Sequence, residues 1–147
     1  MSTPQTPNDY RVTDQVGHLL RRAYQRHTAI FQSVVPANKL SAAQFVVLCA
    51  VRDHAGATIA DIVQATAMDE PAMRGIVERL KWTDLVSVAH EPGDKRHATV
   101  TLTELGRSTV AETLPHAQHI SELTFGDLSA DERQQLTALL RRISGTA

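Results

Sequence analysis

One β-hairpin pattern lies within an otherwise helical sequence, and it limits the possible folds more than any other feature. Residues 85–89 predict a short strand, and residues 97–102 alternate small or apolar with polar side chains, which is typical of a half-buried strand. Pro92-Gly93-Asp94 between them is a turn signal. Lys95, Arg96 and His97 follow the turn, so three basic or titratable side chains are expected at the tip of an exposed hairpin.

Helices are predicted on both sides of the hairpin. Apolar or ring-bearing residues recur at steps of three and four up to Val34, which predicts a helix over about residues 12–34 that Pro36 ends. The later helices begin at N-cap residues, some with a capping-box partner three positions on: Ser41 with Gln44, Thr58 with Asp61, Asp69, Thr103, and Ser129 with Glu132. Pro115 predicts a kink in the helix that begins at Thr103.

This order of elements predicts a mainly α fold with a small β-hairpin, namely a winged helix-turn-helix. We expect residues 1–11 to form a flexible arm and residues 12–147 to form a single domain. The helices at the two ends carry apolar seams, that is, rows of apolar residues with no packing partner expected within one subunit. These seams predict a homodimer, with dimerisation helices over about residues 12–35 and 104–145.

Composition limits the function classes. The chain of 147 residues has 42% hydrophobic residues and a net charge of −1, as ordinary soluble proteins do. A nucleic-acid binder is often strongly basic, but here basic residues cluster locally while acidic residues of the C-terminal third offset them. No apolar run reaches the roughly 18 residues of a membrane span, and the N-terminus lacks the apolar stretch of a signal peptide. The cytoplasm is therefore the expected location.

Residues with reactive side chains are not spaced as catalytic motifs require. The sequence has no G-x-S-x-G, phosphate loop or H-E-x-x-H, so neither an enzyme nor a cofactor is expected. Cys49 lies in an apolar run, and we expect it to be buried and structural rather than a redox sensor. His116 and His119 have a spacing that can chelate zinc, but without a Cys partner a solvated helix face is expected and no metal.

Residues 94–106 resemble the wing of the MarR family of bacterial transcriptional regulators, in which D-x-R-R is followed by four residues and L-T-x-x-G. The chain keeps most of this pattern, with His97 in place of the second Arg: Asp94, Arg96, Leu102, Thr103 and Gly106. Residues 68–86 are similar to the recognition helix of the family, with Asp84 where the family usually has Gly. Within the family, residues 19–31 most resemble regulators of aromatic-acid breakdown, of the nicotinate and hydroxybenzoate type.

The resemblance implies how the chain holds DNA, with a DNA-binding part over about residues 38–103. The helix after Asp69 enters the major groove and the wing follows the minor groove. The residues expected at the DNA are Ser41, Gln44, Pro71, Ala72, Arg74, Lys95, Arg96 and His97. The resemblance also implies that Asp94 pairs with Arg96 and sets its direction. Simple capping is the alternative role for the helix start at Ser41, and a solvated turn is the alternative for the wing.

The recognition helix departs from the family pattern. Glu70 and Pro71 stand where the family often has basic or hydroxyl residues, and Gly75 stands where it often has Arg. Glu70 can accept from cytosine N4 but repels phosphate, while Arg74 can reach a guanine edge or a phosphate. For Arg79, a surface ion pair is the alternative to a DNA contact.

Related proteins bind small aromatic anions, so the resemblance implies an effector site. A carboxylate needs a cation, and its ring needs an apolar wall. Arg21 and Tyr24 share a helix face, and Phe45 can supply the wall from the second helix. The alternatives are a solvated or ion-paired Arg21 and a Phe45 that packs in the core.

The sequence therefore predicts a dimeric DNA-binding transcriptional regulator. Its expected partners are a near-palindromic operator and a small aromatic carboxylate whose binding releases the DNA, which makes the regulator a repressor. The alternative is a small-molecule-binding or enzymatic helical dimer without a role at DNA.

Overall fold

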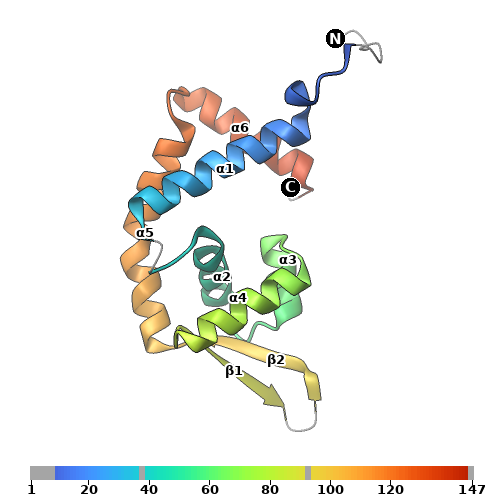
Figure 1. Cartoon of the computed structure of the whole chain (residues 1–147). Helices are drawn as coiled ribbons and strands as arrows, with labels where there is room; N and C mark the ends of the chain where they lie inside the picture. Colours follow the sequence, from blue (N-terminus) through green and yellow to red (C-terminus); the bar gives the residue numbers. More distant parts are fainter. Residues whose placement is uncertain (1–8, 37–38, 92–93, 146–147) are drawn as a thin grey trace. The chain divides into compact units, whose positions relative to one another are not determined.

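The computed structural model describes residues 9–36, 39–91 and 94–145, and it describes only the backbone of residue 91 and of residues 94–97. The described chain is mainly helical with one two-stranded antiparallel sheet, as predicted (Figure 1). Its elements follow in the order η2 (Val12–Asp14), α1 (Val16–Val34), α2 (Ala42–Asp53), α3 (Ile59–Thr66), α4 (Glu70–Trp82), β1 (Val86–Glu91), β2 (Asp94–Leu102), α5 (Glu104–Phe125) and α6 (Ala130–Ser144).

The chain forms two compact units. One comprises residues 1–30 together with 118–147, and the other comprises residues 31–117. Helices α1 and α5 therefore each contribute to both units, while α2, α3, α4 and the hairpin belong wholly to the second, which we call the winged unit. The first unit, which holds α6, we call the terminal unit. The division into a flexible arm and a single domain remains a prediction.

The predicted helix starts are confirmed by their capping contacts. Ser41 Oγ accepts from the Gln44 amide at 3.1 Å, and the Ser41 amide donates to Gln44 Oε1 at 2.9 Å. The same reciprocal pair of bonds opens α3 and α6, and Asp69 alone caps α4. Each cap satisfies helix amides that have no intrahelical partner and contributes about 1 kcal/mol.

The structure defines two of the predicted helices in more detail. The first is a short 3₁₀ turn at Val12–Asp14 and then α1 from Val16, rather than one helix from about residue 12. The second, α5, continues as one α-helix through Pro115. The kink predicted there remains a prediction.

The core of the winged unit gathers one face of each helix and of the hairpin. Its most deeply buried side chains are Leu40, Val47, Leu48, Ile62, Met73, Leu80 and Val100. Val46 is 42% exposed, so the apolar run of α2 is buried on one face and not throughout. The hairpin pairs Val86 with Leu102 and Val88 with Val100, and the Val100 amide donates to the Ala57 carbonyl at 2.8 Å. This bond ties the wing to the connection between α2 and α3.

A tight junction joins the hairpin to the start of α5. Thr103 Oγ1 donates to the Asp84 carbonyl at 2.6 Å and accepts from the Gly106 amide at 2.9 Å, so Thr103 caps α5 as predicted. The Thr103 amide donates to the Leu85 carbonyl at 3.1 Å. A Cβ atom on Gly106 would lie 2.0 Å from that carbonyl oxygen, so only glycine fits. The Gly of the L-T-x-x-G pattern is therefore required by close backbone packing.

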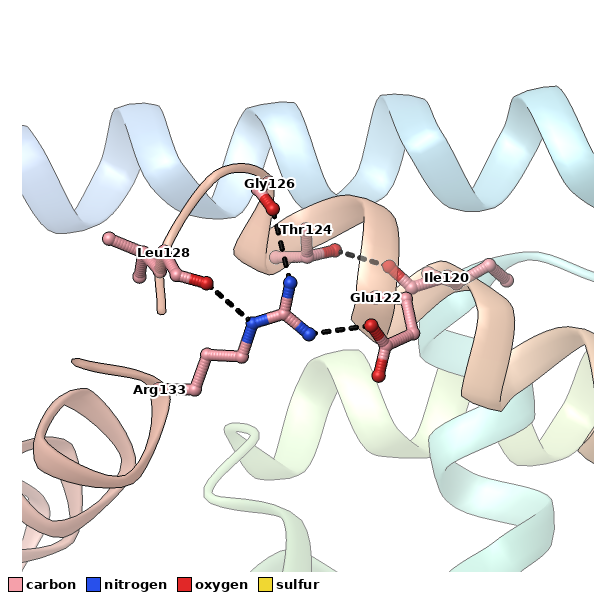
Figure 2. A network of polar contacts seen from close by, with 6 residues as sticks. All are labelled: Ile120, Glu122, Thr124, Gly126, Leu128 and Arg133. Atoms are coloured by element: carbon pink, nitrogen blue, oxygen red, sulfur yellow. Dashed lines mark hydrogen bonds and ion pairs between the residues drawn. The ribbon is translucent and has the colours of Figure 1, made fainter. Parts of the chain in front are cut away.

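The terminal unit is held by two arginines that bond to backbone carbonyls near the C-terminal end of α5. Arg26 on α1 donates to the Thr124 and Leu123 carbonyls at 2.8 and 2.9 Å. Figure 2 shows Arg133 on α6 bonded to the carbonyls of Gly126 and Leu128, at 3.1 and 2.9 Å, and paired with Glu122 at 2.5 Å. The carbonyls at a helix C-terminus have no intrahelical donor, and a guanidinium satisfies several at once.

Candidate functional site

Helix α4 presents a polar face because its apolar face is fully used in the core. Met73, Val77 and Leu80 are buried, and the residues expected at DNA, Pro71, Ala72 and Arg74, are exposed. The Ala72 amide donates to Asp69 Oδ1 at 2.8 Å as part of the cap, and Pro71 lies in the first turn, where a missing amide costs nothing. The fold thus places the start of α4 at the surface.

Arg74 is engaged by an acid on the same face. Its Nε and Nη2 atoms donate to Glu70 Oε1 at 3.1 and 2.7 Å, one helical turn apart. Both side chains remain about 60% exposed, so this ion pair contributes little to stability. In this structure the pair sets the orientation of the guanidinium.

The start of α2 combines capping with free donors. Ser41 Oγ and Gln44 Oε1 act as acceptors in the capping box, so the predicted capping role is confirmed. The hydroxyl proton of Ser41 and the amide N–H groups of Gln44 are not used by these two bonds. Capping therefore leaves both residues with donors that suit a phosphate.

The wing is described only through its backbone at its tip. β2 begins at Asp94, which pairs with Glu91, and the register shifts between Ala89 and Glu91. The side chains of Asp94, Lys95, Arg96 and His97 lie outside the described part of the chain, as do Pro92 and Gly93 of the predicted turn. The Asp94–Arg96 pair therefore remains a prediction.

The predicted effector residues belong to different units. Arg21 and Tyr24 lie on α1 in the terminal unit and are exposed, Tyr24 by 57%. Phe45 lies on α2 in the winged unit, where its ring packs on Phe31 at 5.9 Å between centroids. Phe45 is half-buried, so core packing and a wall for a ligand are both open to it.

His27 makes a polar contact that the sequence did not predict. Its spacing on α1 grouped it with the apolar or ring-bearing residues of the seam. Its Nδ1 lies 2.9 Å from Thr124 Oγ1, and its ring lies 6.3 Å from that of Tyr24. Thr124 Oγ1 already donates to the Ile120 carbonyl at 2.8 Å. Since that hydroxyl has one proton, His27 Nδ1 must be the donor to Thr124, which leaves Nε2 as its free ring nitrogen.

A groove of about 340 Å³ in the winged unit was also not predicted. It runs between the end of α1, Leu85 and the first half of α5, with apolar walls from Val34, Val35, Leu40 and Leu105. Lys39, Glu112 and His116 supply its charged or titratable groups. Apolar walls with one or two cations are what a small aromatic acid requires. No sequence motif predicted this groove, because its residues come from three separate stretches of the chain.

Comparison with known proteins identifies the family. A model of the MarR family matches residues 38–97, which span α2 to the tip of the wing. The HTH-type transcriptional repressor NicR of Pseudomonas putida is 49% identical over 97% of this chain and 90% of its own length. The chain belongs to the MarR family. It is a DNA-binding transcriptional regulator and not an enzyme, as its sequence predicted.

Two solved MarR-family structures resemble the chain closely. BpsR of Bordetella bronchiseptica, described in terms of the regulation of its DNA binding by 6-hydroxynicotinic acid, is 52% identical with a TM-score of 0.85, covering 92% of this chain and 96% of its own. A MarR variant from Escherichia coli in complex with operator DNA is 25% identical with a TM-score of 0.79, covering 91% and 99%. The predicted aromatic-acid-sensing subgroup is thereby confirmed.

Other candidate chemistry in this MarR regulator is limited. Among the residues that the structure describes, no three His, Cys, Asp or Glu side chains are grouped so that they could hold a metal ion. Cys49 is half-buried rather than fully buried, and burial raises the pKa of its thiol, with Arg52 opposing the rise. A raised pKa disfavours the reactive thiolate. Within the described ranges no helix is long and apolar enough to cross a membrane.

Proposed function

We propose that this MarR regulator is a cytoplasmic homodimeric repressor that binds a near-palindromic operator and releases it when a small aromatic acid of the hydroxynicotinate class binds. The observation that carries the proposal is the 52% identity to BpsR over 92% of the chain, since BpsR is regulated by 6-hydroxynicotinic acid. The 49% identity to the repressor NicR supports the direction of regulation.

The DNA-binding role rests on α4, α2 and the wing. The exposed start of α4, with Pro71, Ala72 and Arg74, enters the major groove, where base edges display a full donor and acceptor code. Ser41 and Gln44 donate to phosphate from the start of α2. Lys95 and His97 lie near phosphate, and Arg96, oriented by Asp94, enters the minor groove.

Homodimer formation is supported by apolar side chains that the terminal helices leave exposed. On α6, Leu136, Leu139, Leu140 and Ile143 are 38–64% exposed, and on α1, Val16, Leu19 and Leu20 are 41–62% exposed. Both sets recur at helical spacing, and apolar seams on these two helices were predicted from the sequence, without Leu19. A second copy of the chain would cover them, and two copies present two recognition helices to a palindromic site.

The effector would act by changing the relative population of two dimer conformations. A ligand shifts this equilibrium only by binding one conformation more tightly, so the aromatic acid must prefer the conformation whose recognition helices do not match successive major grooves. Arg21 and Tyr24 on α1 are candidates to bind the carboxylate and the ring, and Phe45 on α2 is a separate candidate for an apolar wall. The groove at Lys39 is a second candidate location, because it offers a cation and apolar walls.

A band-shift titration of the full chain with duplex DNA from its own upstream region tests the proposal. DNA should shift at low salt, and 6-hydroxynicotinate should reverse the shift. Arg96→Ala should weaken DNA binding and lower the salt slope by about 1, with the dimer intact on size exclusion. If the folded dimer does not shift this DNA at low salt, the repressor proposal is wrong.

Two variants locate the effector. Arg21→Ala should raise the concentration of 6-hydroxynicotinate needed for release at least tenfold, because a charge-assisted bond to the carboxylate is lost. If the acid instead occupies the groove of the winged unit, Lys39→Ala should raise that concentration and Arg21→Ala should not. Arg141→Ala, another exposed arginine, serves as the control and should leave release unchanged.

A further inference from the structure

The exposed face of α4 carries a glycine that the fold does not explain. Gly75 lies in the middle of this 13-residue helix, where glycine is less favourable than alanine. Its φ is not positive, and a Cβ atom there would meet no described atom within 4 Å. Gly106 shows the contrast, since a Cβ atom there would collide with the backbone at 2.0 Å. Nothing in the described structure therefore requires glycine at position 75.

The ion pair between Glu70 and Arg74, beside Gly75, leaves N–H donors on Arg74 and one acceptor oxygen on Glu70. Arg74 uses Nε and one Nη2 proton for Glu70 Oε1, so the outer edge of the guanidinium still has N–H groups to donate. Glu70 Oε2 takes no part in these two bonds and can accept. Side by side, a bidentate donor and an acceptor match the O6 and N7 acceptors of guanine and the N4 donor of its paired cytosine.

The same arrangement rejects the other base pair. Adenine keeps N7 but places an N6 donor where guanine has O6, and thymine places its O4 acceptor opposite the carboxylate, so one of the two guanidinium bonds and the carboxylate bond are lost together. A phosphate is also a poor partner, since it would repel Glu70. The pair carries no net charge, so it adds little of the salt-dependent attraction that phosphate contacts provide.

We propose that Glu70 and Arg74 act as one unit that reads a G·C pair in the major groove, and that Gly75 has no side chain so that the α4 backbone can approach the adjoining base edge. This inference rests on the proposed function, because it requires α4 to enter the major groove. It adds which residues determine base specificity and which base pair they select.

Selection from a duplex library with a randomised central segment tests the base-reading unit. The full wild-type chain should enrich sites with a G·C pair at one position of each half-site. Arg74→Ala should weaken binding to the selected duplex about 5- to 150-fold and relax preference at that position only. Glu70→Gln, which keeps the length but can pair with adenine, should move the preference there toward A·T. Arg52→Ala, which breaks an exposed Arg–Asp pair on α2, is the matched control and should change neither.

Gly75→Ala separates a role in DNA binding from a role in folding. The variant should melt about 2–4 °C higher than wild type, because alanine favours the helix, and should bind the selected duplex on the order of tenfold more weakly. Gly17→Ala on α1, where a Cβ atom makes an ordinary 3.6 Å contact, should leave DNA binding unchanged.

The outcomes distinguish this inference from the proposed function. If the wild-type chain enriches no sequence and binds no duplex at low salt, the proposed function itself fails. If it enriches an operator but Arg74→Ala weakens all duplexes equally and lowers the salt slope, Arg74 contacts phosphate and the inference is overturned. Unchanged preference in both Arg74→Ala and Glu70→Gln also overturns it, as does undiminished DNA binding by Gly75→Ala.

Discussion

Replacing Gly106 with alanine should destabilise the junction between the wing and α5. The added Cβ atom would lie 2.0 Å from the Leu85 carbonyl oxygen and 3.4 Å from Leu102 Cδ2. Carbon and oxygen atoms in close contact are normally about 3.3 Å apart, so the two segments must separate by about 1.3 Å. That separation breaks the bond from the Thr103 amide to the same carbonyl oxygen, which is 3.1 Å long.

The size of this effect follows from three contributions. Overpacking against backbone costs about 3 kcal/mol, the lost hydrogen bond costs about 1 kcal/mol, and better helix propensity returns at most about 1 kcal/mol. A net loss of about 2–4 kcal/mol lowers the melting temperature of a chain of this size by about 5–15 °C.

Thermal unfolding followed by circular dichroism measures the effect of Gly106→Ala. Wild type and variant are compared at equal protein concentration, because a dimer melts at a temperature that depends on concentration. Gly17→Ala, which makes only an ordinary contact, is the control and should melt within about 2 °C of wild type or slightly above it. A Gly106→Ala variant that melts as wild type does would refute the reasoning, since the close approach of Leu85 would then not constrain this position.

Three further predictions concern backbone strain, pH and thiol chemistry. Ala67 and Asp84 have φ of 58° and 63°, so Ala67→Gly should stabilise the chain by about 1 kcal/mol in denaturant unfolding, and Asp84→Gly should gain less because Asp tolerates this conformation better. Hydrogen bonds from Ser129 lower the pKa of Glu132, so the stability that Glu132 adds is present above its ordinary pKa of about 4.3 and is lost as pH falls below it. Glu132→Gln should thus melt below wild type at pH 7, and the gap should narrow as pH falls through the lowered pKa of Glu132; a gap that does not narrow in acid would contradict this. Because burial raises the pKa of the Cys49 thiol, iodoacetamide at pH 7.5 should alkylate it more slowly than it alkylates an unstructured cysteine peptide, and equal rates would show that the thiol is not protected.

The backbone conformation at Asp84 explains why the family usually has Gly at this position. The family usually has Gly where this chain has Asp84, and the structure gives this residue a left-handed backbone of φ 63°. Only glycine adopts that conformation without strain, and Asp is among the residues that tolerate it best. The sequence showed the departure, while the backbone angle shows why glycine is favoured there.

Local features of this protein could be determined from the sequence alone. The capping boxes at Ser41, Thr58 and Ser129 join residues only three positions apart, so their residue types predicted the helix starts. The alternation of residues 97–102 predicted the second strand of the hairpin for the same reason, because the side-chain period of a strand is a local property. The order of these elements, with the wing pattern, was sufficient to predict the fold class and the MarR family.

Contacts between distant parts of the chain were decided only by the tertiary structure. Arg26 reaches the Thr124 carbonyl across 98 positions, and no local pattern marks which arginine will do so. His27 appeared as part of an apolar seam until packing brought it to the hydroxyl of Thr124. In the same way, only the atoms around Gly106 and Gly75 show that close backbone packing requires the first glycine and not the second. Sequence determines what a residue can do with its near neighbours, and packing determines which distant groups it meets.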